Sequence, residues 1–189
     1  MQADWSSQSE SGLTLVEFLV VVLIVSLLMT IAIPSMGDWI DQIRRKQVAQ
    51  ALWLGMMQAK SEAVKRNSRV VMCKSHDGMT CALNGGWEQG WLVFHDINNS
   101  GIRDGGEELI SRHVDGDEGV IILSNGNIKR YVSFSQLGYS KLLSGAFQAG
   151  TFMVCPGSRR APDAYRVVLN SLGRVKVETV ASSNCVEAD

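Results

Sequence analysis

A single carboxylate stands inside a long apolar segment near the start of the chain. Residues 13–33 read LTLVEFLVVVLIVSLLMTIAI, and Glu17 is the one charged residue among them. An unpaired carboxylate in hydrocarbon costs several kcal/mol. Cleavage after Gly12 would create an α-amine on Leu13, about one helical turn from Glu17. That amine, in the same chain or in a packed neighbour, would neutralise the carboxylate. The alternative is that Glu17 lies at the level of lipid headgroups.

A second group of oxygen-bearing side chains lies between residues 96 and 107. The sequence DINNSGIRDGGE has the ligand spacing of an EF-hand loop, and calcium is a hard cation that prefers several oxygen ligands. The alternative is a polar hairpin turn, because the flanking segments read as strands and not as helices. The ligands of the calcium hypothesis are Asp96, Asn98, Ser100, Asp104 and Glu107.

Four cysteines could form disulfides or bind a metal. Cys73 and Cys81 flank a turn-like SHDGMT segment, whereas Cys155 and Cys185 are far apart in the sequence. More than one pairing is open to four cysteines. We expect disulfides 73–81 and 155–185, which require an oxidising compartment such as the periplasm. Free buried thiols, or a metal site of Cys73, His76 and Cys81, are the alternatives.

A long helix precedes these groups. Residues 13–33 could form a helix about 30 Å long, enough to cross a bilayer core. A buried core helix is disfavoured in so small a chain. A secretory signal is disfavoured because residues 1–12 hold no Lys or Arg and the apolar run is too long. Residues 34–68 continue as an amphipathic helix, with apolar side chains at helical spacing and Asn67 and Ser68 at its end. These apolar positions are Val48, Leu52, Met56, Ala59 and Ala63.

Residues 69–189 change to short β-rich runs separated by Gly and Asn. Strands without intervening helices favour antiparallel sheet packed on the helix, so the expected fold class is α+β. No nucleophile elbow, phosphate-binding loop or helical His pair is present, so we expect no enzyme. The expected strands are 69–73, 91–95, 109–114, 120–123, 131–134, 151–155, 166–170 and 175–180.

Several of these segments together resemble a known family. GLTLVE at 12–17, followed by the apolar helix, is similar to the class III signal of type IV pilins and type II secretion pseudopilins. Further segments resemble the GspH/FimT family in particular. The resemblance implies a type IV pilin-like fold and a minor pilin or pseudopilin. The matching segments are residues 70–81, 85–104, 150–157 and 165–178.

The resemblance also implies processing, partners and location. Prepilin peptidase would cut between Gly12 and Leu13 and methylate the Leu13 amine, and Glu17 would then contact the amine of an adjacent subunit in a filament. The protein would cross the inner membrane once, with residues 69–189 in the periplasm, or outside the cell within a pilus. The partners would be other pilins or pseudopilins. A role in type IV pilus assembly and a role in type II secretion both fit.

The C-terminal region is locally basic, although the chain has a formal net charge of −1. Gly173 to Lys176 resembles the GRxR signature of FimT-type minor pilins, which bind DNA during natural transformation. Arg174 and Lys176 would share one strand face, because alternate residues point the same way. Weak binding of double-stranded DNA through phosphates is the resulting hypothesis, and a solvated strand face is the alternative. The hypothesis also includes Arg159 and Arg160.

Overall fold

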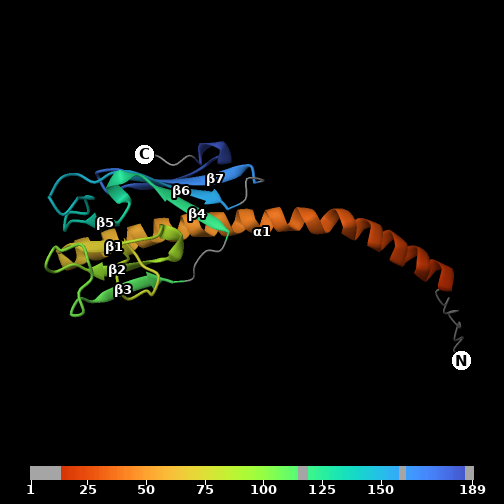
Figure 1. Ribbon diagram of the computed structural model, residues 1–189, viewed down its shortest axis with the longest axis horizontal. Coiled ribbons are helices and arrows are strands. Elements are labelled where there is room, and N and C mark those ends of the chain that lie inside the picture. The colour runs from red at the N-terminus through yellow and green to blue at the C-terminus, as the bar shows by residue number, and fades with distance from the viewer. Residues whose placement is uncertain (1–13, 115–118, 158–160, 186–189) are drawn as a thin grey trace, which may run out of the picture. The chain divides into compact units, whose positions relative to one another are not determined.

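The chain divides into two compact units, Met1–Trp39 and Ile40–Asp189, which are considered separately. A computed structural model describes residues 14–114, 119–157 and 161–185, without the side chains of residues 31–35 (Figure 1). Helix α1, Leu15–Arg66, belongs to both units. Its residues 40–66 are part of the second unit, which also holds every strand described below.

In the described residues of the second unit, the strands form two antiparallel four-stranded sheets. The first sheet has the order β3-β2-β1-β5 and the second the order β4-β6-β7-β8. The strands are β1 Val70–Lys74, β2 Trp91–His95, β3 Leu109–His113, β4 Val120–Ser124, β5 Tyr131–Phe134, β6 Gly150–Pro156, β7 Asp163–Leu169 and β8 Val175–Ala181, and the short 3-10 helices are η1 Trp87–Gln89, η2 Gly126–Ile128 and η3 Ser182–Asn184.

The predicted α+β architecture is confirmed. Each predicted strand is present, and the largest difference is at β7, which begins at Asp163 and not at residue 166. The register of β7 with β8 pairs Asp163 with Ala181, so hydrogen bonding across the hairpin extends the strand beyond its apolar core.

Helix α1 ends at Arg66, directly before the Asn67-Ser68 pair that was predicted to end it, and its first residue beyond the end is left-handed. Asn67 has φ 49°, and its N–H donates to the carbonyl oxygen of Val64 at 3.2 Å. The N–H of Ser68 donates to the carbonyl oxygen of Ala63, also at 3.2 Å. These two bonds form a Schellman motif, which satisfies the last helical carbonyls and turns the chain into β1.

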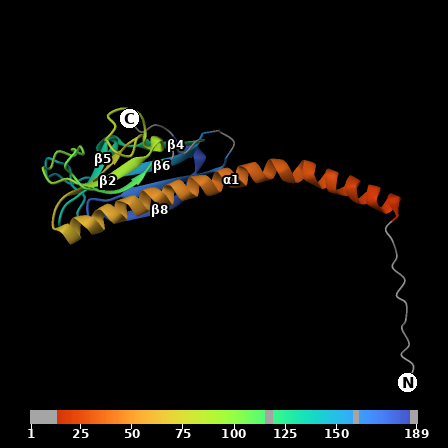
Figure 2. The same ribbon diagram turned by 90° about the horizontal axis from the view of Figure 1, so that it is seen from below.

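One face of residues 40–66 packs on both sheets. The five predicted apolar positions from Val48 to Ala63 are at most 2% exposed and join one core with β1, β2, β4, β5, β6 and β7. Figures 1 and 2 show the two sheets lying along this part of the helix. Small residues permit close approach, since a Cβ on Gly55 would lie 3.1 Å from Nε1 of Trp91. The helix therefore holds the sheets in one core.

The β7–β8 hairpin is tied to α1 through a tight turn. Asn170 accepts N–H bonds from Leu172 and Arg174 on its side-chain oxygen, at 3.0 and 2.9 Å. Lys60 of α1 donates to the carbonyl oxygen of Gly173 at 2.9 Å. Gly173 has φ 68°, and a Cβ there would lie 2.2 Å from the carbonyl oxygen of Gly138. Glycine is thus required by both conformation and space.

We predict that Gly173→Ala lowers the free energy of unfolding by roughly 2 kcal/mol or more, because the side chain adds a steric clash to a left-handed backbone. Urea denaturation of the detergent-solubilised protein, followed by tryptophan fluorescence, measures this. Gly126→Ala is the control, since a Cβ there meets no atom within 4 Å, and it should change stability by less than about 0.5 kcal/mol. Equal effects of the two substitutions on stability would contradict the requirement for glycine at position 173.

Candidate functional site

Glu17 and Thr14 form a reciprocal cap at the start of α1. The backbone N–H and the hydroxyl of Thr14 each donate to Oε2 of Glu17 at 3.1 Å. The N–H of Glu17 in turn donates to the hydroxyl of Thr14 at 3.3 Å. This is a capping box, in which two side chains satisfy backbone donors that have no helical partner. The sequence analysis missed this role, although Thr-x-x-Glu before an apolar run is its signature.

The part of α1 that follows the cap exposes its apolar side chains. Leu15, Leu23 and Leu27 are 75%, 67% and 65% exposed. Within residues 14–114, 119–157 and 161–185, no helical stretch combines the length and the apolar character of a membrane span. The predicted span, residues 13–33, includes Leu13 and the side chains of 31–33, which lie outside the described residues, as does the cleavage residue Gly12.

The structure contains both of the expected disulfides. Cys73 and Cys81 are joined with a Cα–Cα distance of 5.6 Å, and Cys155 and Cys185 with one of 6.0 Å. The first disulfide closes the loop after β1, and the second attaches η3 to β6. Neither free thiols nor a Cys73–His76–Cys81 metal site is present, because all four cysteines are bonded.

Asp77 organises the loop that the first disulfide closes. Its Oδ1 accepts the N–H groups of Met79 and Thr80 at 2.8 and 2.9 Å, and its Oδ2 accepts the Thr80 hydroxyl at 2.7 Å. The Ser75 hydroxyl donates to Oδ1 at 2.9 Å. The backbone N–H groups of Thr80 and Met79, followed by the Thr80 hydroxyl, hold the pKa of Asp77 well below its usual range.

The candidate calcium ligands bond to their own loop. Asp96 is fully buried, and its two oxygens accept the N–H groups of Ser100 and Gly101 at 2.9 and 3.1 Å. Burial raises the pKa of Asp96, and these N–H donors oppose the rise. The two oxygens of Glu107 accept the N–H groups of Ile97 and Asp104 at 2.8 and 3.1 Å.

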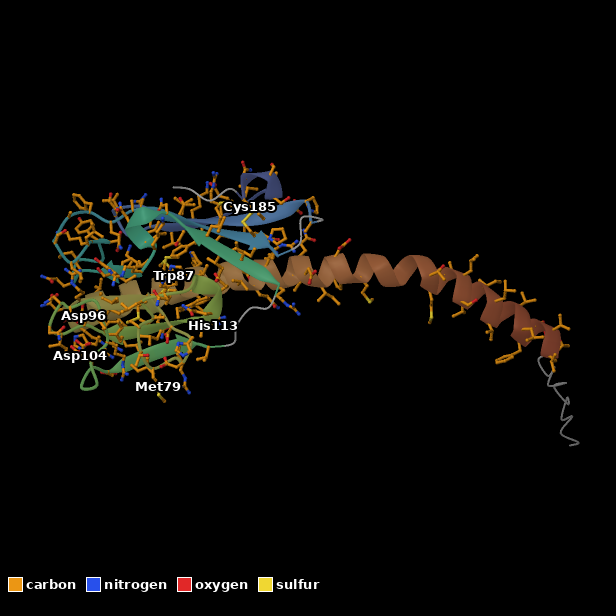
Figure 3. The ribbon with its side chains drawn as sticks, viewed as in Figure 1. Met79, Trp87, Asp96, Asp104, His113 and Cys185 are labelled. Atoms are coloured by element: carbon orange, nitrogen blue, oxygen red, sulfur yellow. A yellow bond between two sulfur atoms is a disulfide. The ribbon has the colours of Figure 1, made fainter. Side chains whose placement is uncertain are left out.

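The remaining candidate ligands also bond within this loop, in which Figure 3 labels Asp96 and Asp104. The Asn98 amide donates to Oδ2 of Asp104 at 2.5 Å, and the Ser100 hydroxyl donates to the carbonyl oxygen of Ile102 at 2.8 Å. In the described ranges, no three His, Cys, Asp or Glu side chains gather closely enough to hold a metal ion. These bonds within the loop favour the polar turn, and the calcium site stays a prediction.

The basic residues in and beside β8 are partly neutralised by an acidic neighbour. Lys176 of β8 and Arg174, which directly precedes β8, are both exposed. However, Nζ of Lys176 lies 2.7 Å from Oε1 of Glu178, and Arg166 donates to Oε2 of Glu178 from Nε at 3.0 Å. Lys176 and then Arg166 lower the pKa of Glu178. Arg159 and Arg160 lie outside the described residues.

A family model for the type II transport protein GspH matches residues 48–173, two thirds of the chain and most of the second unit. The chain belongs to the GspH family. No curated protein matches it in sequence. Membership implies interaction with other pilins or pseudopilins and agrees with the predicted GspH/FimT resemblance.

Solved structures show the same fold. The type IV minor pilin FimU of Pseudomonas aeruginosa PAO1 has a TM-score of 0.54 at 17% identity, covering 77% of this chain and 95% of that chain. The minor pseudopilin EpsH from the type 2 secretion system of Vibrio cholerae has a TM-score of 0.50 at 12% identity, covering 73% and 97%. The predicted type IV pilin-like fold of the GspH family is therefore confirmed.

We predict that Asp77→Asn lowers the free energy of unfolding by roughly 0.5–1 kcal/mol near neutral pH, a modest loss because the group is exposed to water. The pKa of Asp77 is lower in the folded state than its ordinary 3.8. The stabilisation is therefore present above that pH and is lost as the pH falls through the folded pKa.

Urea denaturation between pH 2.5 and 7 tests this. The difference in the free energy of unfolding between Asp77→Asn and the unmodified protein should be constant above about pH 5 and should shrink below about pH 4. Asp41→Asn, at an exposed position of α1, controls for the general effect of removing one negative charge. A difference between the two proteins that does not depend on pH would refute the role of the Asp77 charge.

Proposed function

We propose that this GspH-family protein is a minor pilin that supports assembly of a type IV pilus. Residues 13–33 anchor it in the inner membrane, with the second unit in the periplasm. Prepilin peptidase cleaves between Gly12 and Leu13 and methylates Leu13. The supporting observation is one charged side chain, Glu17, at the start of a helix whose apolar side chains are exposed.

The exposed apolar side chains of α1 support insertion followed by assembly. Phe18 and Leu19 are 63% and 57% exposed, and neighbouring apolar residues on all sides of the helix are similarly exposed. Such a surface is unstable in water and needs a cover. Lipid covers it in the membrane, and helices of neighbouring subunits cover it in a filament.

The cap leaves Glu17 able to bind a neighbour. Both bonds from Thr14 reach Oε2 of Glu17, so in the described residues Oε1 takes no part in the cap. A carboxylate oxygen accepts more than one hydrogen bond. Glu17 can therefore cap its own helix and pair with the methylated amine of an adjacent subunit at the same time.

We predict that Glu17→Gln reduces incorporation into sheared filaments by roughly tenfold, because the amide keeps an oxygen for the cap but loses the charge that pairs with the amine. Immunoblots of sheared filaments and of the membrane fraction measure incorporation and insertion. Thr14→Val removes the hydroxyl of the cap and keeps the carboxylate, so it should assemble within about twofold of the unmodified protein.

Normal incorporation of Glu17→Gln would refute the assembly role of the charge. Mass spectrometry of the membrane-extracted protein tests the processing step, since the mature chain should begin at a methylated Leu13. A chain that keeps residues 1–12 would contradict the proposal independently of the filament assay.

The alternative function is that of a minor pseudopilin in type II secretion. The similarity to FimU and the similarity to EpsH both concern the fold. They therefore do not favour a pilus role over a secretion role. Deleting the gene in its host distinguishes them. Loss of surface filaments supports the pilus, and accumulation of exported proteins in the periplasm supports secretion.

DNA binding is a second candidate function, favoured by the exposure of Lys176 on β8 and of Arg174, which directly precedes β8. We predict that Arg174→Gln with Lys176→Gln weakens binding to duplex DNA roughly tenfold at low salt and lowers the salt slope, because two phosphate contacts are lost. Glu178→Gln should strengthen binding, because it frees Lys176 and Arg166 from their carboxylate partner.

Gel-shift titrations of the detergent-solubilised full-length protein at two salt concentrations give these affinities. Lys141→Gln, outside β8, is the control for the loss of a single positive charge. Absence of a shift for the unmodified protein, or no change in either direction for the β8 variants, would exclude this function.

A further inference from the structure

Lys74 is a lysine on the inner face of its sheet. Strand residues alternate between two faces, and Val70 and Met72 of β1 belong to the core shared with α1. Val71 and Cys73 belong instead to a smaller cluster on the other face. Lys74 continues the inner series and is 6% exposed. The position is one where an apolar side chain is expected, and a cation there needs an explanation.

Lys74 lines a pocket between the end of β1 and strand β4. The pocket has a volume of about 470 Å³. Trp87 (Figure 3) is 1% exposed and is held by a bond of 3.1 Å from Nε1 to the carbonyl oxygen of Ile128, so this wall is rigid. The lining residues are Lys74, Gly85, Gly86, Trp87, Glu88, Ile121, Ile122, Leu123, Ser124 and Lys129.

The ammonium group of Lys74 has no carboxylate partner among the described residues. Its one hydrogen bond there goes to the carbonyl oxygen of Gly85, at 2.5 Å, although an ammonium group has three donors. Burial, followed by the charge of Arg130, lowers the pKa of Lys74, and the charge of Glu88, which lines the same pocket, opposes this. A buried charge without a counter-ion is unfavourable, so an anion entering the pocket would relieve that cost.

The same pocket exposes a strand edge. β4 is the outer strand of its sheet, because it pairs with β6 on one side only. The N–H of Ile122 points away from β6 and is met, at 3.4 Å, by Oε2 of Glu88. This long bond from a side chain takes the place that a neighbouring strand would fill. Ile121, 45% exposed, adds an apolar contact beside the edge.

We propose that this pocket binds an extended segment of a partner protein, whose backbone pairs with the outer edge of β4 and whose acidic side chain pairs with Lys74. The juxtaposition of a buried cation and a strand edge, whose Ile122 N–H is met by the side chain of Glu88 and not by a strand, favours a polypeptide over a free anion, since a small ion would use only the cation. The segment would displace Glu88 from this edge. Lys129 at the pocket wall adds positive charge for an acidic segment. The inference goes beyond the filament role and does not depend on it.

Short peptides test the proposal on the full-length protein in detergent. Acetyl-Val-Glu-Val-amide carries one carboxylate on an extended backbone, and acetyl-Val-Gln-Val-amide lacks only the charge. Lysine labelled with ¹³C at Cε reports Lys74 directly by NMR. We expect the Glu peptide to shift the Lys74 resonance and to bind about tenfold more tightly than the Gln peptide. Lys74→Met should remove this preference, and Lys141→Met, outside the pocket, should keep it.

Two further probes distinguish the source of the carboxylate. Sodium acetate should bind far more weakly than the Glu peptide, because it cannot pair with β4. Acetyl-Pro-Glu-Pro-amide should also bind weakly, because its prolines have no N–H to donate to the strand edge. The proposal is overturned if the two valine peptides bind equally or not at all, or if acetate or the proline peptide binds as tightly as the Glu peptide. The peptide comparisons on the unmodified protein remain decisive even if Lys74→Met does not fold.

Discussion

The packing of one helical face against two sheets is the constraint on which the second unit depends. The two sheets share no strand, and α1 is the element that gives both a common core. Small residues on the packed face, such as Ala49 and Ala59, let the sheets approach closely. The pocket beside Lys74 and the β7–β8 hairpin both exist where they do because the helix fixes the sheets on which they lie.

Much of this fold could be predicted, because its signals are local. The strands followed from short β-rich runs separated by Gly and Asn, and the helix end followed from the Asn67-Ser68 pair. The disulfide Cys73–Cys81 encloses a short turn, so its pairing could be predicted from residues that are close together in the sequence. The apolar positions of α1 were readable because one helix face stays buried over several turns.

The features that were missed depend on distant parts of the chain. Glu178 neutralises Lys176 and also Arg166 on the neighbouring strand, and that second pairing needs the register of β7 with β8. Lys74 reads as an ordinary surface lysine, because only the sandwich of helix and sheets makes its strand face an inner one.

The disulfide between Cys155 and Cys185 has a mechanical consequence. The two cysteines are 30 residues apart, and β7 and β8 lie between them. A chain stretched from its ends cannot extend this segment while the sulfurs are joined, which withholds roughly 100 Å of contour length. A molecule pulled until its strands separate would therefore release that length only after reduction, so single-molecule extension in reducing and oxidising buffer would report the state of the bond directly.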